Sequence, residues 1–333
     1  MAKVGGIYGT SQRLARVLSM VVAAAPVDSS SSSSLPKVQR AVVVRRHGGV
    51  DVLEHVSDWP IPTCGPDEVL VQNAVAGVNY IDIYFREGKP GYSSSPPYVA
   101  GLEGAGIVVM AGDVAQQRGV LPGTRVAYMR SKSGSYAEYA TVNISFLVQL
   151  PHTIRFDAGA TLMIQGLTAH YLCTSAYKAG PGTRALVHAA AGGTGLAVVQ
   201  VLKQLGASVV GTVGSTDKAW VARAAGADEV VIYGDAVTGS NWAVAAKVAA
   251  GGPIDVVYDG VGRSTLLQSL EVVRARGTVV LFGYASGQPD PVPVAALAGS
   301  KFLTRPSLFD YIAAPKELAD RAKDVFAWYE KGA

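Results

Sequence analysis

The stretch that decides the fold runs from His188 to Ala207 and reads HAAAGGTGLAVVQVLKQLGA. The segment RALVHA leads into it, and its β-branched and aliphatic residues predict a strand. After the small residues, leucine and valine recur at three- to four-residue spacing, which predicts a helix that Gly206 is well placed to end. A strand, a glycine-rich turn and a helix in this order are typical of a dinucleotide-binding unit.

The glycines of the turn, Gly192, Gly193 and Gly195, carry no Cβ and let the backbone approach a pyrophosphate. A helix beginning near Gly195 presents N–H groups and a positive dipole end to the same anion. The spacing is A-x-x-G-x-x-G counted from Ala189, not the common G-x-G-x-x-G, so the motif alone is weak. The alternative is a tight turn that only packs the helix closely on the sheet.

The surrounding sequence favours a dinucleotide-binding loop over a purely structural turn, because alternating strands and helices continue after it. We predict strands over 208–213, 229–233, 254–259 and 277–283, and helices over 216–225, 241–252 and 264–274. This α/β pattern predicts a Rossmann-type, doubly wound parallel sheet over 161–287. Residues 37–160 read instead as short strands between glycine and proline turns, so we expect a mostly β domain there.

Composition excludes several classes of protein. The chain has 333 residues, of which 49% are hydrophobic and 16% charged, so it is long enough for two well-packed domains. Residues 1–40 carry the whole net charge of +4, and the remainder balances to zero, so we expect no nucleic-acid partner. We find no apolar run long enough for a membrane span. Two cysteines without metal-ligand spacing predict no zinc site and fit a reducing compartment.

The N-terminus differs from the rest of the chain. Residues 1–27 contain no acidic side chain, hydrophobic residues recur at helical spacing around Leu14–Val21, and a six-serine run follows at Ser29–Ser34. Basic, amphipathic and serine-rich segments are typical of organelle transit peptides. We therefore expect residues 1–36 to be a disordered or targeting extension. The expected location is cytoplasmic, with import into mitochondria as the alternative.

The loop HAAAGGTG resembles that of the zeta-crystallin-like quinone oxidoreductases, within the medium-chain dehydrogenase/reductase superfamily. Other matching segments occur in the family's order and extend over roughly 40–310: HGGVDVLE, GVNYIDIYFREG, GLEGAG, QGLTAHYL, GTVGSTDKA, VVYDGVGRST and TRPSL. The resemblance implies a GroES-like catalytic domain over 37–160, a Rossmann cofactor-binding domain over 161–287 and a return segment over 288–333. Chains of this family continue beyond a segment like DRAKDVFAWYEKGA, so we expect the C-terminal part of the catalytic domain to be missing.

The same resemblance bears on metal chemistry. Zinc-dependent members of the superfamily carry a cysteine near the position of Val78 or Asn79 and a histidine just before Glu103. Here the segments read GVNYID and GLEGAG, with Leu102 in the histidine position. Without a Lewis acid, alcohol oxidation is disfavoured, whereas quinones and α,β-unsaturated carbonyls accept hydride without a metal. We therefore expect no zinc and an electron-poor acceptor.

The resemblance also implies individual site residues. Asn79 and Tyr84 are the expected catalytic residues at the nicotinamide end, where Tyr84 would donate a proton to the reduced oxygen. The expected cofactor-binding residues are Gln165, Thr168, Ala191, Gly192, Gly193, Thr194, Gly195, Gly214, Ser215, Lys218, Tyr233, Gly260, Phe282, Gly283 and Ser286. Each has a structural alternative as a packing, turn or surface residue. For His170 and His188 we favour structural roles. Arg305 matches a family position near the cleft between the two domains, and the alternative is a surface arginine.

The expected cofactor is NADPH rather than NADH. NAD-binding Rossmann domains place an acid about 20 residues after the loop, where it binds the ribose 2′-OH. Here that position falls in GTVGST, which has no carboxylate. Ser215 and Lys218 follow and can bind a 2′-phosphate, while Tyr233 resembles a further phosphate or adenine contact. We expect Asp217 to point to solvent in the first helical turn.

These observations predict an NADPH:quinone oxidoreductase that works without zinc, by hydride or stepwise electron transfer. One alternative is a 2-alkenal or enoyl-thioester reductase on the same scaffold. Another is a non-catalytic NADPH-bound structural or RNA-binding protein, which the balanced charge of residues 41–333 makes weaker. A homodimer is implied by the resemblance alone.

Overall fold

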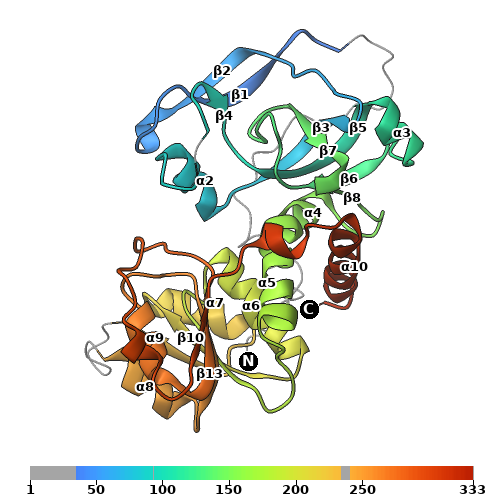
Figure 1. The fold of residues 1–333 in the computed structure, drawn as a ribbon. Helices are drawn as coiled ribbons and strands as arrows, with labels where there is room; N and C mark the ends of the chain where they lie inside the picture. Colours follow the sequence, from blue (N-terminus) through green and yellow to red (C-terminus); the bar gives the residue numbers. More distant parts are fainter. Residues whose placement is uncertain (1–34, 93, 234–240, 333) are drawn as a thin grey trace, which may run out of the picture. The chain divides into compact units, whose positions relative to one another are not determined.

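The computed structural model of the chain describes residues 35–92, 94–233 and 241–332. The chain divides into two units, which Figure 1 colours along the sequence. The first unit contains the described residues through Ile164 together with Leu318–Gly332, and the second contains Gln165–Glu317. Nearly all of the N-terminal extension expected over 1–36 lies outside the described residues.

The second unit is built on one six-stranded sheet. Its strands are β9 (Arg184–Val187), β10 (Ser208–Val213), β11 (Glu229–Ile232), β12 (Ile254–Asp259), β13 (Val273–Leu281) and β14 (Phe302–Thr304). They are arranged in the order β11-β10-β9-β12-β13-β14, and all neighbours run parallel. Numbered from β9, this is the 3-2-1-4-5-6 order of the Rossmann fold, so the predicted doubly wound parallel sheet is confirmed.

Helices join these strands in the predicted alternation. The α-helices of the unit are α5 (Leu167–Tyr171), α6 (Gly193–Gln204), α7 (Thr216–Ala224), α8 (Trp242–Ala249) and α9 (Leu266–Val272). Shorter helical turns are π-helical over Leu172–Ala176 and 3₁₀ over Val294–Leu297 and Leu308–Tyr311. Another π-helical segment, Leu162–Gly166, leads into α5. Gly206 follows α6 with φ of +80°, a left-handed conformation that favours glycine, as the sequence predicted.

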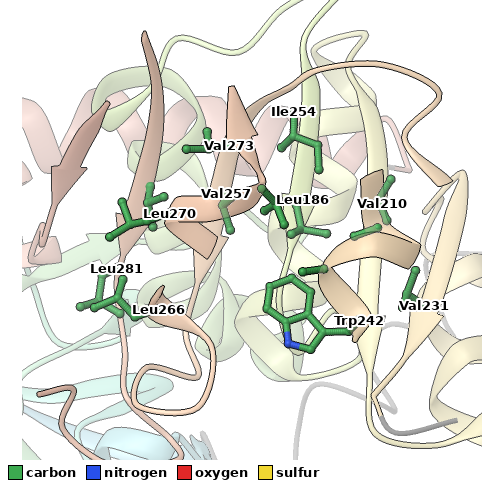
Figure 2. Packing of buried hydrophobic residues seen from close by; sticks show 14 residues of the cluster. Leu186, Val210, Val231, Trp242, Ile254, Val257, Leu266, Leu270, Val273 and Leu281 are labelled. Carbon is green, nitrogen blue, oxygen red and sulfur yellow. The ribbon is translucent and has the colours of Figure 1, made fainter. Parts of the chain in front are cut away.

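The core on one face of the sheet is a row of aliphatic side chains in register across neighbouring strands. Leu186 of β9 lies opposite Val210 on one side and Val257 on the other. Figure 2 shows this row packed against Trp242 of α8 and Leu270 of α9. All of these side chains are buried. Because parallel strands are covered on both faces, their sequences read as continuous apolar runs instead of alternating.

Two boundaries of the second unit differ from the prediction. The helix expected over 264–274 ends at Val272, because Val273 already has an extended backbone (φ −67°, ψ 139°) and begins β13. The unit also continues through Glu317, beyond the expected 287. The reason is β14, which pairs with β13 and adds a sixth strand to the sheet; the first residue pair is Thr278 of β13 with Phe302 of β14.

The first unit is mostly β, as predicted. Its strands are β1 (Val38–Val44), β2 (Leu53–Pro60), β3 (Glu68–Gly77), β4 (Tyr98–Val99), β5 (Glu103–Ala111), β6 (Arg125–Tyr128), β7 (Tyr139–Asn143) and β8 (Leu147–Gln149). They form a sheet of order β2-β1-β4 and another of order β7-β3-β5-β6-β8. All of the pairings within these two sheets are antiparallel.

Helices of the first unit are short except at its C-terminal end. They are α2 (Tyr80–Arg86), α3 (Asp113–Gln117), α4 (Phe156–Thr161) and α10 (Pro315–Glu330), with 3₁₀ turns over Val50–Val52 and Ile144–Phe146. From Leu318 on, α10 belongs to this unit, and the Thr153 hydroxyl donates a hydrogen bond to Glu330 near its end. The helix α2 follows β3 closely; of the two residues that the sequence predicts to be catalytic, Asn79 is its N-cap and Tyr84 lies within it.

Candidate functional site

Most of the predicted cofactor-binding residues lie in loops at one edge of the six-stranded sheet. We call this the carboxyl edge and define it as residues 188–195, 214–218, 233, 260–264 and 282–287. These loops follow β9 to β13, and the carboxyl ends of parallel strands meet at a common edge. The strand order reverses between β9 and β12, so the glycine-rich loop after β9 stands at the topological switch point where such sheets bind ligands.

The glycine-rich loop has close backbone contacts that require its glycines. Ala189 is exposed and left-handed (φ +51°), and its carbonyl accepts a hydrogen bond from Gly192 N–H at 2.8 Å. A Cβ on Gly195 would collide with that same carbonyl, and one on Gly193 would collide with the Gln165 amide. The helix α6 begins at Gly193, two residues before the expected start. Its N-cap, Gly192, offers no side-chain cap, which suits a helix end that binds an anion.

Two predicted residues approach this loop from α5 and the segment before it. Gln165 is buried beside Gly193, and Thr168 is half-buried on α5, which packs on α6. The loop residues Ala191 and Thr194 are also half-buried. The structure therefore places Gln165 beside the start of α6 and Thr168 on the helix that packs on α6.

The turn after β10 is the most open part of the carboxyl edge. Gly214 has free space where a Cβ would stand, and Ser215, Asp217 and Lys218 are all exposed. Ser215 caps α7 by accepting a hydrogen bond from the backbone N–H of Lys218 at 3.4 Å. Asp217 lies in the first turn of α7, the position expected from the sequence. No carboxylate stands at the end of β10 itself.

The loops after β12 and β13 hold each other in place. Phe282 packs against Gly260, where its ring leaves no room for a Cβ, and Gly283 lies close to the Gly260 carbonyl. The Ser286 hydroxyl donates to the Val261 carbonyl at 2.7 Å and accepts from the Ser264 N–H at 3.0 Å. These predicted residues are thus brought together, and the Ser286 hydroxyl donates and accepts its hydrogen bonds within the protein.

Behind these loops lies a buried polar cluster, of which the sequence analysis singled out His188 and Tyr233 but not Asp259. Asp259, at the end of β12, is fully buried and accepts hydrogen bonds from the N–H groups of Val261 and Gly262. His188, at the end of β9, is also fully buried, which lowers the pKa of its imidazole. Tyr233, a predicted cofactor contact, turns its hydroxyl toward His188 at 2.6 Å. The sequence signal for this cluster was the presence of polar residues at the ends of neighbouring apolar strands.

In the first unit, the predicted catalytic residue Asn79 caps α2. Asn79 and Asp82 form a reciprocal capping box, in which the Asn79 N–H donates to Asp82 Oδ2 at 2.8 Å. The Asn79 side-chain amide donates to Glu103 Oε1 at 2.6 Å. Tyr136 adds a hydrogen bond from its hydroxyl to Asp82 Oδ2 at 2.7 Å. The two family-like segments GVNYID and GLEGAG therefore meet through side chains.

Glu103 is the buried acid at the centre of this arrangement. It has no exposed surface, and its second oxygen accepts a hydrogen bond from the Ile164 N–H at 2.7 Å. Burial raises the pKa of Glu103 to about 8, against the opposing effect of its hydrogen bonds. Burial likewise raises the pKa of Asp82 to about 6. The sequence signal was an acidic residue at the head of the otherwise apolar strand β5.

Tyr84, the other predicted catalytic residue, is buried within an aromatic cluster. Its ring lies 5.0 Å from the ring of Tyr92 and 5.5 Å from that of Tyr80, centroid to centroid. The Lys89 ammonium lies 4.8 Å from the Tyr84 ring centroid. A cation over an aromatic face is an attractive contact, so Lys89 helps to fix the Tyr84 ring.

Within residues 35–92, 94–233 and 241–332 there is no group of three or more histidine, cysteine or acidic side chains placed to hold a metal ion. The position expected for a zinc-ligating histidine is Leu102, which has no lone pair to donate, and Asn79 is held by Glu103. Both cysteines, Cys64 and Cys173, are free thiols. In the same part of the chain, none of the helices has the length and apolar character needed to cross a membrane.

Comparison with known proteins agrees with this architecture. Residues 65–152 match the alcohol dehydrogenase GroES-like domain, and residues 193–321 match the zinc-binding dehydrogenase family. The chain is 40% identical to a quinone oxidoreductase of Pseudomonas aeruginosa and 35% identical to a 2-haloacrylate reductase of a Burkholderia species, each over 86% of both chains. It superposes on the structure of Escherichia coli quinone oxidoreductase complexed with NADPH with a TM-score of 0.82, at 36% identity over 88% of both chains.

These matches extend over both units of the chain. The resemblance that the sequence motifs indicated is therefore confirmed. The chain belongs to the quinone oxidoreductase family of the medium-chain dehydrogenase/reductase superfamily.

Proposed function

We propose that the protein is an NADPH-dependent quinone oxidoreductase that works without zinc. The observation that carries the proposal is the carboxyl edge: a glycine-rich loop with an uncapped helix start beside a turn with no carboxylate at the end of β10. The relative from Escherichia coli, whose structure was solved with NADPH, supports the choice of cofactor. The quinone oxidoreductases among the relatives support the reaction.

The residues of the carboxyl edge fit NADPH. The start of α6 and the glycines before it would hold the pyrophosphate, because backbone N–H groups and the helix dipole favour an anion there. Ser215 and Lys218, both exposed beside the open Gly214, would hold the 2′-phosphate. The remaining predicted residues, including Gln165 and Thr168, would line the rest of the cofactor.

When bound, NADPH supplies a hydride to the acceptor. A quinone spreads the developing charge over its conjugated ring, so the protein needs to deliver only a proton to the reduced oxygen. Tyr84 is the proposed donor, and the Lys89 ammonium over its ring helps to fix the orientation of that ring. Asn79 is held by Glu103 and by the capping box of α2, which fixes the direction of its amide.

The second candidate is reduction of an α,β-unsaturated carbonyl. The 35% identity to the Burkholderia 2-haloacrylate reductase favours it, because an activated alkene accepts hydride by similar chemistry. The third, a non-catalytic NADPH-bound protein, would share the carboxyl edge but would not need Tyr84. The homodimer that the resemblance implies and a cytoplasmic location also stay proposals, and the two free thiols support a reducing compartment.

Steady-state turnover with NADPH separates these candidates. We would compare a panel of benzo- and naphthoquinones with a panel of 2-alkenals and 2-haloacrylates, and we expect higher kcat/KM with the quinones. Higher kcat/KM with the alkenes would establish the second candidate. Tight NADPH binding without turnover of either panel would favour the non-catalytic one. Activity that depends on stoichiometric zinc would contradict the zinc-free proposal.

A further inference from the structure

Glu103 connects two parts of the first unit that are far apart in the sequence. Its Oε1 accepts a hydrogen bond from the Asn79 side-chain amide at 2.6 Å, and its Oε2 accepts one from the Ile164 N–H at 2.7 Å. Glu103 has no exposed surface, so water cannot take the place of either bond. One buried carboxyl group thus holds the proposed catalytic amide and the backbone of Ile164 at the same time.

The backbone of Ile164 lies where the chain leaves the first unit. The chain passes from the first unit to the second between Ile164 and Gln165. Both residues belong to the π-helical segment Leu162–Gly166, which joins α4 to α5. π-Helical turns are rare and are found mostly as short insertions within α-helices, frequently at functional sites. Glu103 therefore adds a side-chain acceptor to an irregular segment at the connection between the units.

The next residue, Gln165, places its side chain against the glycine-rich loop. Gln165 is buried, and a Cβ on Gly193 would collide with its side-chain amide. Gly193 is the first residue of α6, and the start of this helix is the proposed site of the cofactor pyrophosphate. A phosphate bound there therefore lies beside a residue that follows Ile164 directly in the chain.

The amide of Asn79 is held in one orientation. The Asn79 side chain accepts a hydrogen bond from the Asp82 N–H in the capping box of α2. An amide accepts through its oxygen and donates through its nitrogen, so the nitrogen of Asn79 faces Glu103. A displacement of the Glu103 carboxyl must move this amide or lengthen a buried hydrogen bond, because packed protein interiors transmit strain.

We propose that Glu103 is a positioning residue that ties the Asn79 amide to the backbone of Ile164, so that a phosphate bound at the glycine-rich loop changes the environment of Asn79. The contacts run from Gly193 to the Gln165 side chain, along the backbone to Ile164, and through Glu103 to Asn79. We call this series of contacts the relay. Through it, the catalytic amide takes its working position when the cofactor is bound. This inference rests on the proposed function, both for the cofactor and for the role of Asn79.

Side-chain amide signals of asparagine test the relay without measuring turnover. The chain has four asparagines, so protein labelled with ¹⁵N-asparagine gives a small spectrum that single substitutions assign. The probe is adenosine 2′,5′-bisphosphate, which carries phosphates for the carboxyl edge but lacks the nicotinamide that the proposed function places at Asn79. At saturation with this probe, we expect the Asn79 side-chain signals to shift. Asn73, whose amide donates to the Ser135 and Ala137 carbonyls, is the internal control and should not shift.

Two variants interrupt the relay at different points. Glu103→Gln keeps the size of the side chain but has a single acceptor oxygen, so its NH2 group faces one of the two buried donors and that bond is lost. Titration calorimetry should show that the bisphosphate still binds, while the Asn79 signals no longer shift. Gln165→Ala removes the contact with Gly193 without touching the buried acid, and it should abolish the shift as well. If Glu103→Gln does not fold, Gln165→Ala decides the test.

Turnover separates positioning from folding. In Glu103→Gln, kcat with quinones should fall about tenfold, the effect of one lost hydrogen bond, while the KM for NADPH changes by less than about twofold. Glu68→Gln is the matched control, because Glu68 is another buried acid of the first unit, accepts from the Gly65 N–H at 2.9 Å and has no part in the relay. It should keep both kcat and the Asn79 shift. Equal losses of kcat in the two variants, or an unchanged kcat in Glu103→Gln, would overturn the positioning role.

The binding data distinguish failure of the relay from failure of the proposed function. If the unsubstituted protein binds neither NADPH nor the bisphosphate, the proposed function fails and the relay fails with it. If the bisphosphate binds and the Asn79 signals do not shift, or if the shift persists in Glu103→Gln or Gln165→Ala, the relay alone is overturned and the proposed function stands.

Discussion

The carboxyl edge of the second unit and the α2 region of the first hold their functional residues by different kinds of contact. We define the α2 region as residues 79–86 together with Glu103 and Tyr136. At the carboxyl edge, backbone geometry does most of the positioning: parallel strands end together, and glycines allow close approaches such as that of Gly195 to Ala189. In the α2 region, hydrogen bonds to side chains position the residues, and the acceptors are the buried acid Glu103 and the capping acid Asp82.

This difference decides how each region responds to change. Because backbone geometry forms the carboxyl edge, a substitution there should reduce function mainly when it removes a side chain that contacts the ligand or adds a Cβ to a glycine. A region built on buried acids depends on every partner, because an unsatisfied buried donor costs about 1–3 kcal/mol. Substitutions of the hydrogen-bonded residues Asn79, Asp82 and Glu103 should therefore reduce stability and activity together, whereas those at the carboxyl edge should separate the two.

The largest effect should come from Glu103→Ala. It removes the acceptor of two buried donors, the Asn79 amide and the Ile164 N–H, so we expect a loss of about 4 kcal/mol in unfolding free energy. Urea unfolding measures this. Glu103→Gln is the matched control, because its amide oxygen still accepts one of the two bonds, and it should lose less than half as much. Equal losses would mean that shape, and not hydrogen bonding, makes Glu103 necessary.

Stability should also fall as pH rises from 6.5 to 8. Burial raises the pKa of Glu103 to about 8, so the folded protein keeps a proton there that the unfolded chain has already lost. Raising the pH therefore favours unfolding, at up to about 1.4 kcal/mol per pH unit, until the folded form is ionised as well. Asp82, with its pKa raised to about 6, acts mainly below this window. Melting temperatures of the unsubstituted protein and Glu103→Gln should converge near pH 8, and parallel curves would refute the assignment.

Next in size is the effect of Tyr84→Phe on turnover. Removing a general acid costs about a hundredfold in kcat, and the buried ring should keep the aromatic cluster and the fold intact. Quinone turnover at saturating NADPH measures kcat, and the melting temperature checks the fold. Tyr139→Phe, a half-buried tyrosine on β7, is the control and should retain full activity. An active Tyr84→Phe would mean that the proton comes from elsewhere.

At the carboxyl edge, Lys218→Glu should separate cofactor choice from stability. The exposed side chain supports no packing, so the melting temperature should stay unchanged. Loss of its contact with the 2′-phosphate should raise the KM for NADPH about tenfold or more, equivalent to at least about 1.4 kcal/mol, with little effect on NADH. Arg223→Glu, exposed at the other end of α7, controls for net charge. Equal changes with both cofactors would remove Lys218 from phosphate recognition.

The regular parts of the molecule were predictable because a local pattern determines them. The strands and helices from β9 to β13 follow apolar runs and helical spacing, and the parallel order then places the loops after Val187, Val213 and Asp259 at one edge. The resemblance of the motifs supplied the two-domain architecture. The short strand β14 has only three residues and no strong pattern, so its place in the sheet could not be predicted.

The buried polar groups were not predictable in the same way. Asn79 and Glu103 are 24 positions apart, and nothing in either segment shows that they share a hydrogen bond. His188 reads as an ordinary histidine at a strand end until its neighbours Thr212, Tyr233 and Ser269 are known. Tertiary pairing of polar side chains depends on distances across the fold, which hydrophobic periodicity does not encode.

The smallest effect should come from Ser286→Ala, and it shows which of the predicted cofactor residues belong to the scaffold. Its hydroxyl donates to the Val261 carbonyl and accepts from the Ser264 N–H, so it ties two loops together and has no hydrogen left for a cofactor oxygen. Because Ser286 is exposed, water can replace these bonds, and the loss in unfolding free energy should be about 0.5–1 kcal/mol. KM values for NADPH and NADH should change by less than about twofold and together, since about 0.4 kcal/mol corresponds to a factor of two. A selective loss of NADPH affinity would show instead that Ser286 gives up its loop contact to bind the cofactor directly.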